Sequence, residues 1–116
     1  MVRRCTYRVQ LNAKFGFDHA AEVADYLAAL GVSHLYASPY LQAAPGSTHG
    51  YDVIDHSRLS NELGGGAAHA RMIAALKAAG LGHIIDTVPN HMSIATRDNR
   101  LWWDVLRNGL ASPYAR

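Results

Sequence analysis

The stretch Ile84–His91, IIDTVPNH, changes abruptly from apolar residues to an acid, an amide and an imidazole. Strands of a parallel sheet that is covered on both faces are continuous apolar runs, and ligand-binding residues follow their carboxyl ends. The pattern therefore predicts a buried strand over residues 81–88 that leads into a functional loop. A single acid in such a place is more often a turn or cap residue. The clustering of Asp86, Asn90 and His91 after one strand favours a functional site.

The sequence before this stretch alternates between strand and helix patterns. β-Branched and aromatic residues over 6–11 indicate a strand. Asp18 is placed to cap a helix whose apolar residues recur with helical spacing, and Gly31 is placed to end that helix. A second strand follows over 32–37, and Pro39 cannot continue it. A helix between two strands is typical of a parallel βαβ unit.

The second half of the chain repeats this order after a long polar segment. Residues 40–66 show neither helical nor strand periodicity, so we expect a long loop, which is usually functional or disordered. A second helix is predicted over 67–79, with Gly80 at its end. Beyond the strand at 81–88, another helix is predicted near residues 98–108, with Asp98 as its cap and one apolar face spaced for burial.

Three predicted strands alternate with two crossover helices, which favours the α/β class and the first three βα units of a (β/α)8 TIM barrel. Such a barrel takes about 250 residues, so the barrel is incomplete in a chain of 116. We expect residues 1–116 to be the N-terminal part of the catalytic barrel domain, with 89–116 beginning an insertion after the third strand. The alternative is a small doubly wound domain, for which the segment 40–66 is a large insertion.

Composition excludes several partners. The net charge of +2, without a dense basic stripe, makes nucleic acid an unlikely partner. Cys5 is the single cysteine, so the chain has no internal disulfide, and this suits a reducing cytoplasm. No apolar stretch approaches the length of a membrane span, so we expect no membrane partner.

Parallel strands place their following loops at one edge of the sheet. The segment 47–52, STHGYD, is therefore expected to approach Asp86, Asn90 and His91. The aromatic face and polar tip of Tyr51 suit stacking on a sugar ring or a heterocycle. From the pattern alone, a Tyr that only pins its loop is an equal alternative.

Seven histidines invite a metal-site interpretation. Asp86, His91, His49 and Asp52 could together chelate a divalent ion, but neither HExxH nor paired-cysteine spacing supports such a site. The other five histidines are interpreted as packed or solvated. The glycines at 64–66 lack the Lys-Ser or Lys-Thr of a phosphate loop. We predict no metal and no cofactor, and metal binding stays open as an alternative.

Two of these segments resemble known signatures. Asp86–His91 resembles the D-x-x-x-N-H region of the α-amylase superfamily (glycoside hydrolase family 13), and His49–Asp52 resembles its companion after the second strand. Four segments are more narrowly similar to the maltooligosyl trehalose synthase family: 6–11, 31–36, 45–53 and 61–65. That family converts the reducing-end α-1,4 linkage of a maltooligosaccharide into an α,α-1,1 linkage in trehalose biosynthesis. The resemblance implies an N-terminal fragment of such an enzyme, classed as an isomerase.

Carried over by position, the resemblance implies that Tyr51 stacks under a sugar and that His91 hydrogen-bonds its hydroxyls. Asp52 and Asp86 would support the site. His49 is also expected to contact substrate.

Asn90 is a further expected substrate contact. It matches a residue that helps to bind calcium in many amylases, although calcium is not implied for the synthases. The nucleophile and the acid/base of the family, about 5 Å apart, follow later strands. The resemblance therefore implies no catalytic carboxylate in this chain, and we predict that the isolated chain is inactive.

The expected partners are a maltooligosaccharide substrate and the remainder of the barrel, in the same or a separate chain. Two other functions remain open at this stage. One is a fragment of an α-amylase-type hydrolase, or of a metal-dependent barrel hydrolase that uses Asp86, His91 and His49. The other is a truncated remnant without enzymatic function.

Overall fold

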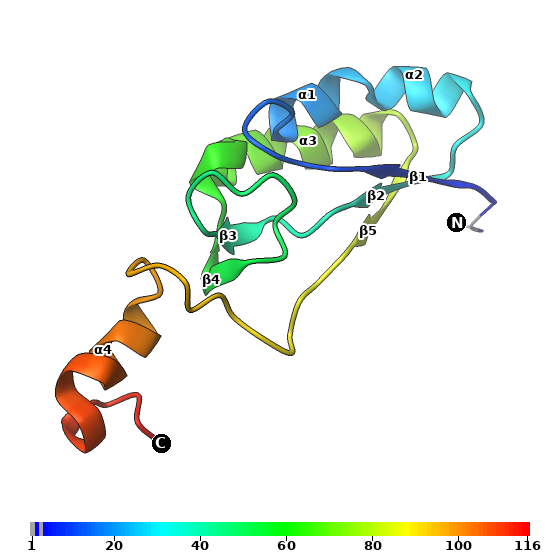
Figure 1. Ribbon diagram of the computed structural model, residues 1–116. Helices are drawn as coiled ribbons and strands as arrows, with labels where there is room; N and C mark the ends of the chain where they lie inside the picture. The colour runs from blue at the N-terminus through cyan, green and yellow to red at the C-terminus, as the bar shows by residue number, and fades with distance from the viewer. Residues whose placement is uncertain (1, 3) are drawn as a thin grey trace.

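The computed structural model describes residue 2 and residues 4–116, and its centre is a parallel sheet. The sheet has the strand order β1-β2-β5, formed by β1 (Thr6–Val9), β2 (His34–Ala37) and β5 (Gly82–Ile85). Three helices lie together on one side of it (Figure 1): α1 (Phe17–Glu22), α2 (Ala24–Ala29) and α3 (Gly65–Ala78). The predicted alternation of parallel strands and crossover helices is confirmed.

The core lies between the sheet and these helices. On β2, Leu35 and Ala37 are fully buried, whereas His34 and Tyr36 are only partly buried. Leu35 therefore points toward the helices, where α3 supplies Met72. Burying a side chain of this size contributes about 1.5–3 kcal/mol to stability. Side chains of the other parity, such as Tyr36, lie on the opposite face of the sheet.

The prediction that residues 40–66 lack regular structure is wrong. The segment contains an antiparallel pair and a short 3-10 helix: β3 (Leu41–Ala43), β4 (Val53–Leu59) and η1 (Asn61–Leu63). Only the start of β4 is buried, at Val53 and Ile54, and the β3–β4 register contains irregularities. A strand with mostly polar residues and an irregular register shows no period-2 pattern in the sequence.

Several predicted boundaries and caps are also wrong. The first helix is split at Val23, where the backbone has ψ near 0°, into α1 and α2. It begins after Gly16, and Asp18 lies inside α1 and does not cap it, because its carboxylate accepts two 2.8 Å hydrogen bonds from Arg71 on α3. The predicted end at Gly31 is confirmed, with a left-handed φ of 87°.

The remaining differences concern the later elements. Helix α3 begins at Gly65, two residues before the predicted start at residue 67. Strand β1 ends at Val9 and β5 spans Gly82–Ile85, which makes both shorter than predicted. The last helix, α4 (Arg100–Asn108), is capped by Asn99 and not by Asp98, since the Asn99 side chain accepts the Trp102 N–H at 3.1 Å.

Helix α4 extends away from the sheet (Figure 1), and none of its residues is buried. The expected burial of its apolar face is therefore wrong within this structure. Trp103 is partly buried and donates its indole N–H to the Thr96 carbonyl at 2.6 Å, whereas Leu106 is exposed. Among the helices of the described residues, none is long and apolar enough to cross a membrane.

Candidate substrate-binding site

The predicted site residues lie at the carboxyl ends of the parallel strands. The Asp86 N–H donates to the Ala37 carbonyl at 3.0 Å, which extends the pairing of β5 with β2 by one residue. This bond fixes the backbone of Asp86 at the edge of the sheet. Asp86 and Ile84 alternate with Ile85, so they lie on the face away from the helices.

Tyr51 reaches this edge from the loop before β4. Its hydroxyl donates to Asp86 Oδ2 at 2.5 Å and accepts a hydrogen bond from Arg8 Nη2 at 3.1 Å. The carboxylate of Asp86 raises the pKa of the Tyr51 phenol, and the Arg8 guanidinium acts in the opposite direction. The phenol is therefore neutral near pH 7 and serves as a donor. The expected approach of segment 47–52 to Asp86 is confirmed.

His91 contacts the same tyrosine through the backbone. Its Nε2 lies 3.2 Å from the carbonyl oxygen of Tyr51. Since a carbonyl only accepts, Nε2 carries the proton, and Nδ1 of the neutral ring is left as an acceptor. The His91 side chain is exposed, so this Nδ1 is open to a ligand hydroxyl.

His49 stacks on the Tyr51 ring, with centroids 5.9 Å apart and planes inclined by 28°. The Tyr51 N–H donates to His49 Nδ1 at 3.0 Å, so the neutral ring carries its proton on Nε2. Asp52 Oδ1 lies 3.8 Å from the same Nδ1, and in this tautomer the contact is not an ion pair. Asp52 instead accepts the hydroxyl proton of Ser47.

Asn90 is the predicted site residue for which the structure records no contact with the others. Its side chain is exposed, and none of the described residues is hydrogen-bonded to it. The expected grouping after β5 is therefore confirmed for Asp86 and His91 with Tyr51, whereas the substrate contact expected of Asn90 stays a prediction.

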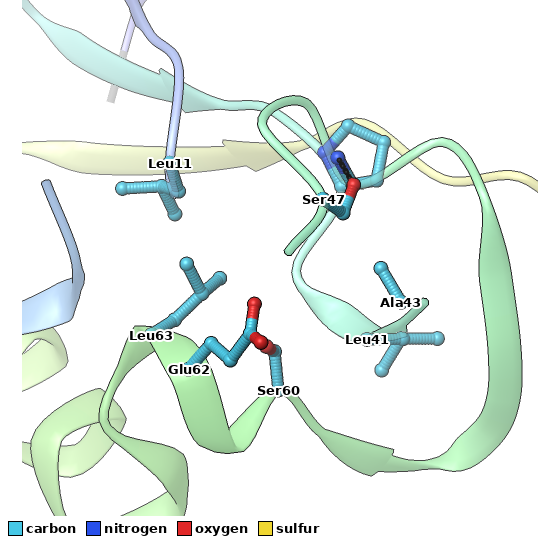
Figure 2. Close-up of a pocket in the computed structure, with 9 residues that line it drawn as sticks. Leu11, Leu41, Ala43, Ser47, Ser60, Glu62 and Leu63 are labelled. Carbon is cyan, nitrogen blue, oxygen red and sulfur yellow. Dashed lines mark hydrogen bonds between the residues drawn. The ribbon is translucent and has the colours of Figure 1, made fainter. Parts of the chain in front are cut away.

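A small pocket, lined in part by Ser47 and Gly50, lies beside the loop that carries Tyr51 (Figure 2). Apolar side chains form most of this pocket, and Glu62 accepts the Gly46 N–H at 3.0 Å. Its volume is about 10 Å³, roughly the space of one water molecule. At Gly50, φ is +82° and a Cβ atom would lie 2.1 Å from the Pro39 carbonyl oxygen. Only glycine fits there without displacing the loop.

Sequence reasoning missed Arg8 and Gln10 as parts of the site. Gln10 donates to the Thr48 carbonyl at 2.9 Å and accepts from Arg8 at 3.4 Å, and so ties β1 to the loop of Tyr51. The signal that could have found them is a strand with polar side chains in an otherwise covered sheet, because such groups require partners.

The proposed metal set is not assembled. Within residue 2 and residues 4–116, no three His, Cys, Asp or Glu side chains are grouped as metal ligands. Asp86 Oδ2 is bonded to Tyr51, and His91 donates to a carbonyl. The arrangement instead places the aromatic ring of Tyr51 beside the polar side chains of Asp86, Arg8 and His49.

Comparisons with known proteins show the family of the chain. The alpha-amylase catalytic-domain family matches residues 20–109. A relative from Mycobacterium tuberculosis, provisionally named a maltooligosyl trehalose synthase, is 49% identical over 95% of this chain and 15% of its own length. The solved maltooligosyltrehalose synthase from Arthrobacter ramosus has 46% identity and a TM-score of 0.93, over 96% of this chain and 15% of that one.

A malto-oligosyltrehalose trehalohydrolase from Rhizobium sp. is 42% identical over 65% of this chain and 13% of its own length. The chain spans about 15% of the length of the curated synthase relatives it matches. Its parallel strands and crossover helices correspond to part of a TIM barrel. The chain belongs to the alpha-amylase family, and its close relatives are maltooligosyl trehalose synthases.

Proposed function

We propose that this chain is the substrate-positioning part of a maltooligosyl trehalose synthase. The reaction converts the reducing-end α-1,4 linkage of a maltooligosaccharide into an α,α-1,1 linkage. In this proposal the 116 residues form the first three βα units of the catalytic (β/α)8 barrel, and residues 89–116 begin an insertion. The single cysteine, Cys5, is compatible with a cytoplasmic location.

The observation that carries the proposal is the fixed position of the Tyr51 ring. Its hydroxyl is bonded to Asp86 and Arg8, and the imidazole of His49 stacks on the ring. The phenol is thus already partnered, so its free ring face is what remains for a sugar. His49 and His91 both contact Tyr51, one through its ring and one through its backbone carbonyl, and their remaining ring nitrogens suit sugar hydroxyls.

The acids of this chain have supporting roles in the proposal. Retaining glycoside chemistry needs a nucleophile and an acid/base about 5–5.5 Å apart. Asp86 accepts from Tyr51, and Asp52 accepts from Ser47, so both carboxylates orient other site residues. The reactive pair is therefore expected from later strands of the barrel, in the same or a separate chain.

A graft tests the proposal. The matching segment of the Arthrobacter ramosus synthase, 46% identical, is replaced by residues 1–116 of this chain. We expect the graft to consume the reducing ends of maltopentaose, because an α,α-1,1 linkage is non-reducing. Hydrolysis, the reaction of the amylase-type alternative, would instead create reducing ends.

The same graft with Tyr51→Ala is the matched control, and it should retain the fold but lose most of the activity. A folded graft that only hydrolyses maltopentaose, or that leaves it unchanged, would contradict the proposal.

A further inference from the structure

We infer that Arg8 is a positioning residue of this site, which holds the Tyr51 ring in place through the phenol oxygen. The inference deepens the proposed function and rests on it for the identity of the substrate. The hydrogen bonds that carry it are independent of the substrate.

Arg8 lies on β1 and Asp86 directly follows β5, and these are the two outer strands of the sheet. Arg8 is paired in register with Tyr36, and Tyr36 with Ile84, two residues before Asp86 on the same face. Adjacent strands are about 4.8 Å apart, so the backbones of β1 and β5 are separated by roughly 10 Å. The Tyr51 hydroxyl bridges this distance, at 3.1 Å from Arg8 Nη2 and 2.5 Å from Asp86 Oδ2.

The guanidinium is itself held on three sides. Its Nη1 donates to Gln10 Oε1 at 3.4 Å, its Nη2 donates to Tyr51, and its Cζ lies 5.9 Å from the centroid of the Tyr36 ring. A planar group with several fixed donors constrains direction better than an ammonium group does. Arg8 therefore determines where the Tyr51 hydroxyl sits, and a two-sided bond to the hydroxyl limits tilting of the ring.

The charges agree with this assignment. The phenol lies between a guanidinium and a carboxylate, and the two have opposite effects on its pKa. Without Arg8, the hydroxyl would keep one charged partner, Asp86, and the ring would be anchored at one side only.

A double-mutant cycle in the graft tests the role of Arg8. Loss of a charge-assisted hydrogen bond should lower kcat/KM for maltopentaose roughly tenfold in Arg8→Met. Tyr51→Phe removes the same hydroxyl bonds, so Arg8→Met should change kcat/KM less than about twofold in that background. Arg71→Met is the matched control, because Arg71 forms an exposed ion pair with Asp18 on the outer helices. It should leave kcat/KM unchanged.

A second measurement does not depend on activity. The 116-residue chain is labelled at the tyrosine Cζ and studied by NMR, and the signal that is missing in Tyr51→Phe belongs to Tyr51. The phenol pKa should rise in Arg8→Met and fall in Asp86→Asn, relative to the parent chain. The inference would be overturned if Arg8→Met lowered kcat/KM by the same factor in the Tyr51→Phe background as in the parent graft. It would also be overturned if Arg8→Met left the pKa of the Tyr51 phenol unchanged. An inactive graft with the expected pKa changes would overturn the proposed function and leave the positioning role supported.

Discussion

The phenol oxygen of Tyr40 lies 3.3 Å from Nε2 of His83 and 3.4 Å from Nε2 of His69, between the sheet and helix α3. His83 Nδ1 lies 3.3 Å from the Leu35 carbonyl and must donate to it. The Tyr40 hydroxyl therefore donates to His83 Nε2 and accepts from His69. Protonation of His83 would leave the Tyr40 hydroxyl without its acceptor.

We expect these hydrogen bonds of Tyr40 to make the protein less stable in mild acid. Burial lowers the pKa of both His83 and His69 below the value of about 6.5 expected in the unfolded chain. The unfolded state therefore binds protons first, so the stabilisation is complete above about pH 6.5 and falls as the pH drops toward the folded-state values. The urea midpoint should decrease between about pH 7.5 and pH 5.

A variant isolates the cause. His83→Gln keeps an acceptor for Tyr40 without a titrating group, and should weaken the pH dependence. The lowered pKa values of Asp18 and Asp55, caused by hydrogen bonds from Arg71 and Ser57, place their effects at lower pH. A midpoint constant over this range would contradict the prediction.

Gly50→Ala should destabilise the loop of Tyr51 more than Gly46→Ala does. Both glycines have left-handed φ, 82° and 77°, so each alanine costs about 1–2 kcal/mol in backbone conformation. A Cβ atom at Gly46 has nothing within 4 Å, whereas at Gly50 it would overlap the Pro39 carbonyl. The free energy of unfolding, measured with urea, should therefore be lower in Gly50→Ala than in Gly46→Ala by at least about 2 kcal/mol. Equal effects would mean that the close approach to Pro39 is absent in solution.

Tyr51→Ala and Tyr51→Phe should differ in the graft if the ring is a sugar platform. Alanine removes the aromatic face and should lower kcat/KM for maltopentaose by more than roughly a hundredfold. Phenylalanine keeps the face and loses only the bonds to Arg8 and Asp86, so a decrease of roughly tenfold is expected. Similar losses for both variants would favour the alternative in which Tyr51 only pins its loop.

The isolated 116-residue chain should not convert maltopentaose. In the proposed function its site residues only orient a sugar. Asp86 and Asp52 accept hydrogen bonds from Tyr51 and Ser47, and neither acts as a nucleophile. Binding groups without an acid/base and a nucleophile supply no covalent intermediate. The check is the amount of non-reducing product against a buffer blank. Product above the blank would require a catalytic carboxylate within these residues.

The sequence predicted the elements whose patterns are local. Apolar spacing identified the helices that cover the sheet, and Gly31 and Gly80 were correctly predicted to end them, with φ of 87° and 71°. The caps were predicted less well. Asp18 and Asp98 have suitable side chains, but whether such a side chain bonds its own helix depends on competing partners, such as Arg71 in the case of Asp18.

The antiparallel pair β3–β4 could not be predicted from its residues. Its strands mix polar and apolar side chains without a regular period, and they are stabilised by pairing and by contacts with distant segments, for example the hydrogen bond from Ser93 N–H to the Val53 carbonyl at 2.8 Å. A contact across forty residues leaves no periodic signal in either segment.

By itself, the sequence determined the parallel α/β order and the edge of the sheet at which Asp86, His91 and Tyr51 would meet, because strand direction alone places these loops together. Only the tertiary structure decided how they bond. It showed the phenol of Tyr51 between Arg8 and Asp86, and the hydrogen-bond partners of His49 and His91. Whether a hydrogen bond forms depends on differences of a few tenths of an ångström in the distance between its donor and acceptor. For residues far apart in the chain, the spacing in the sequence does not contain that information.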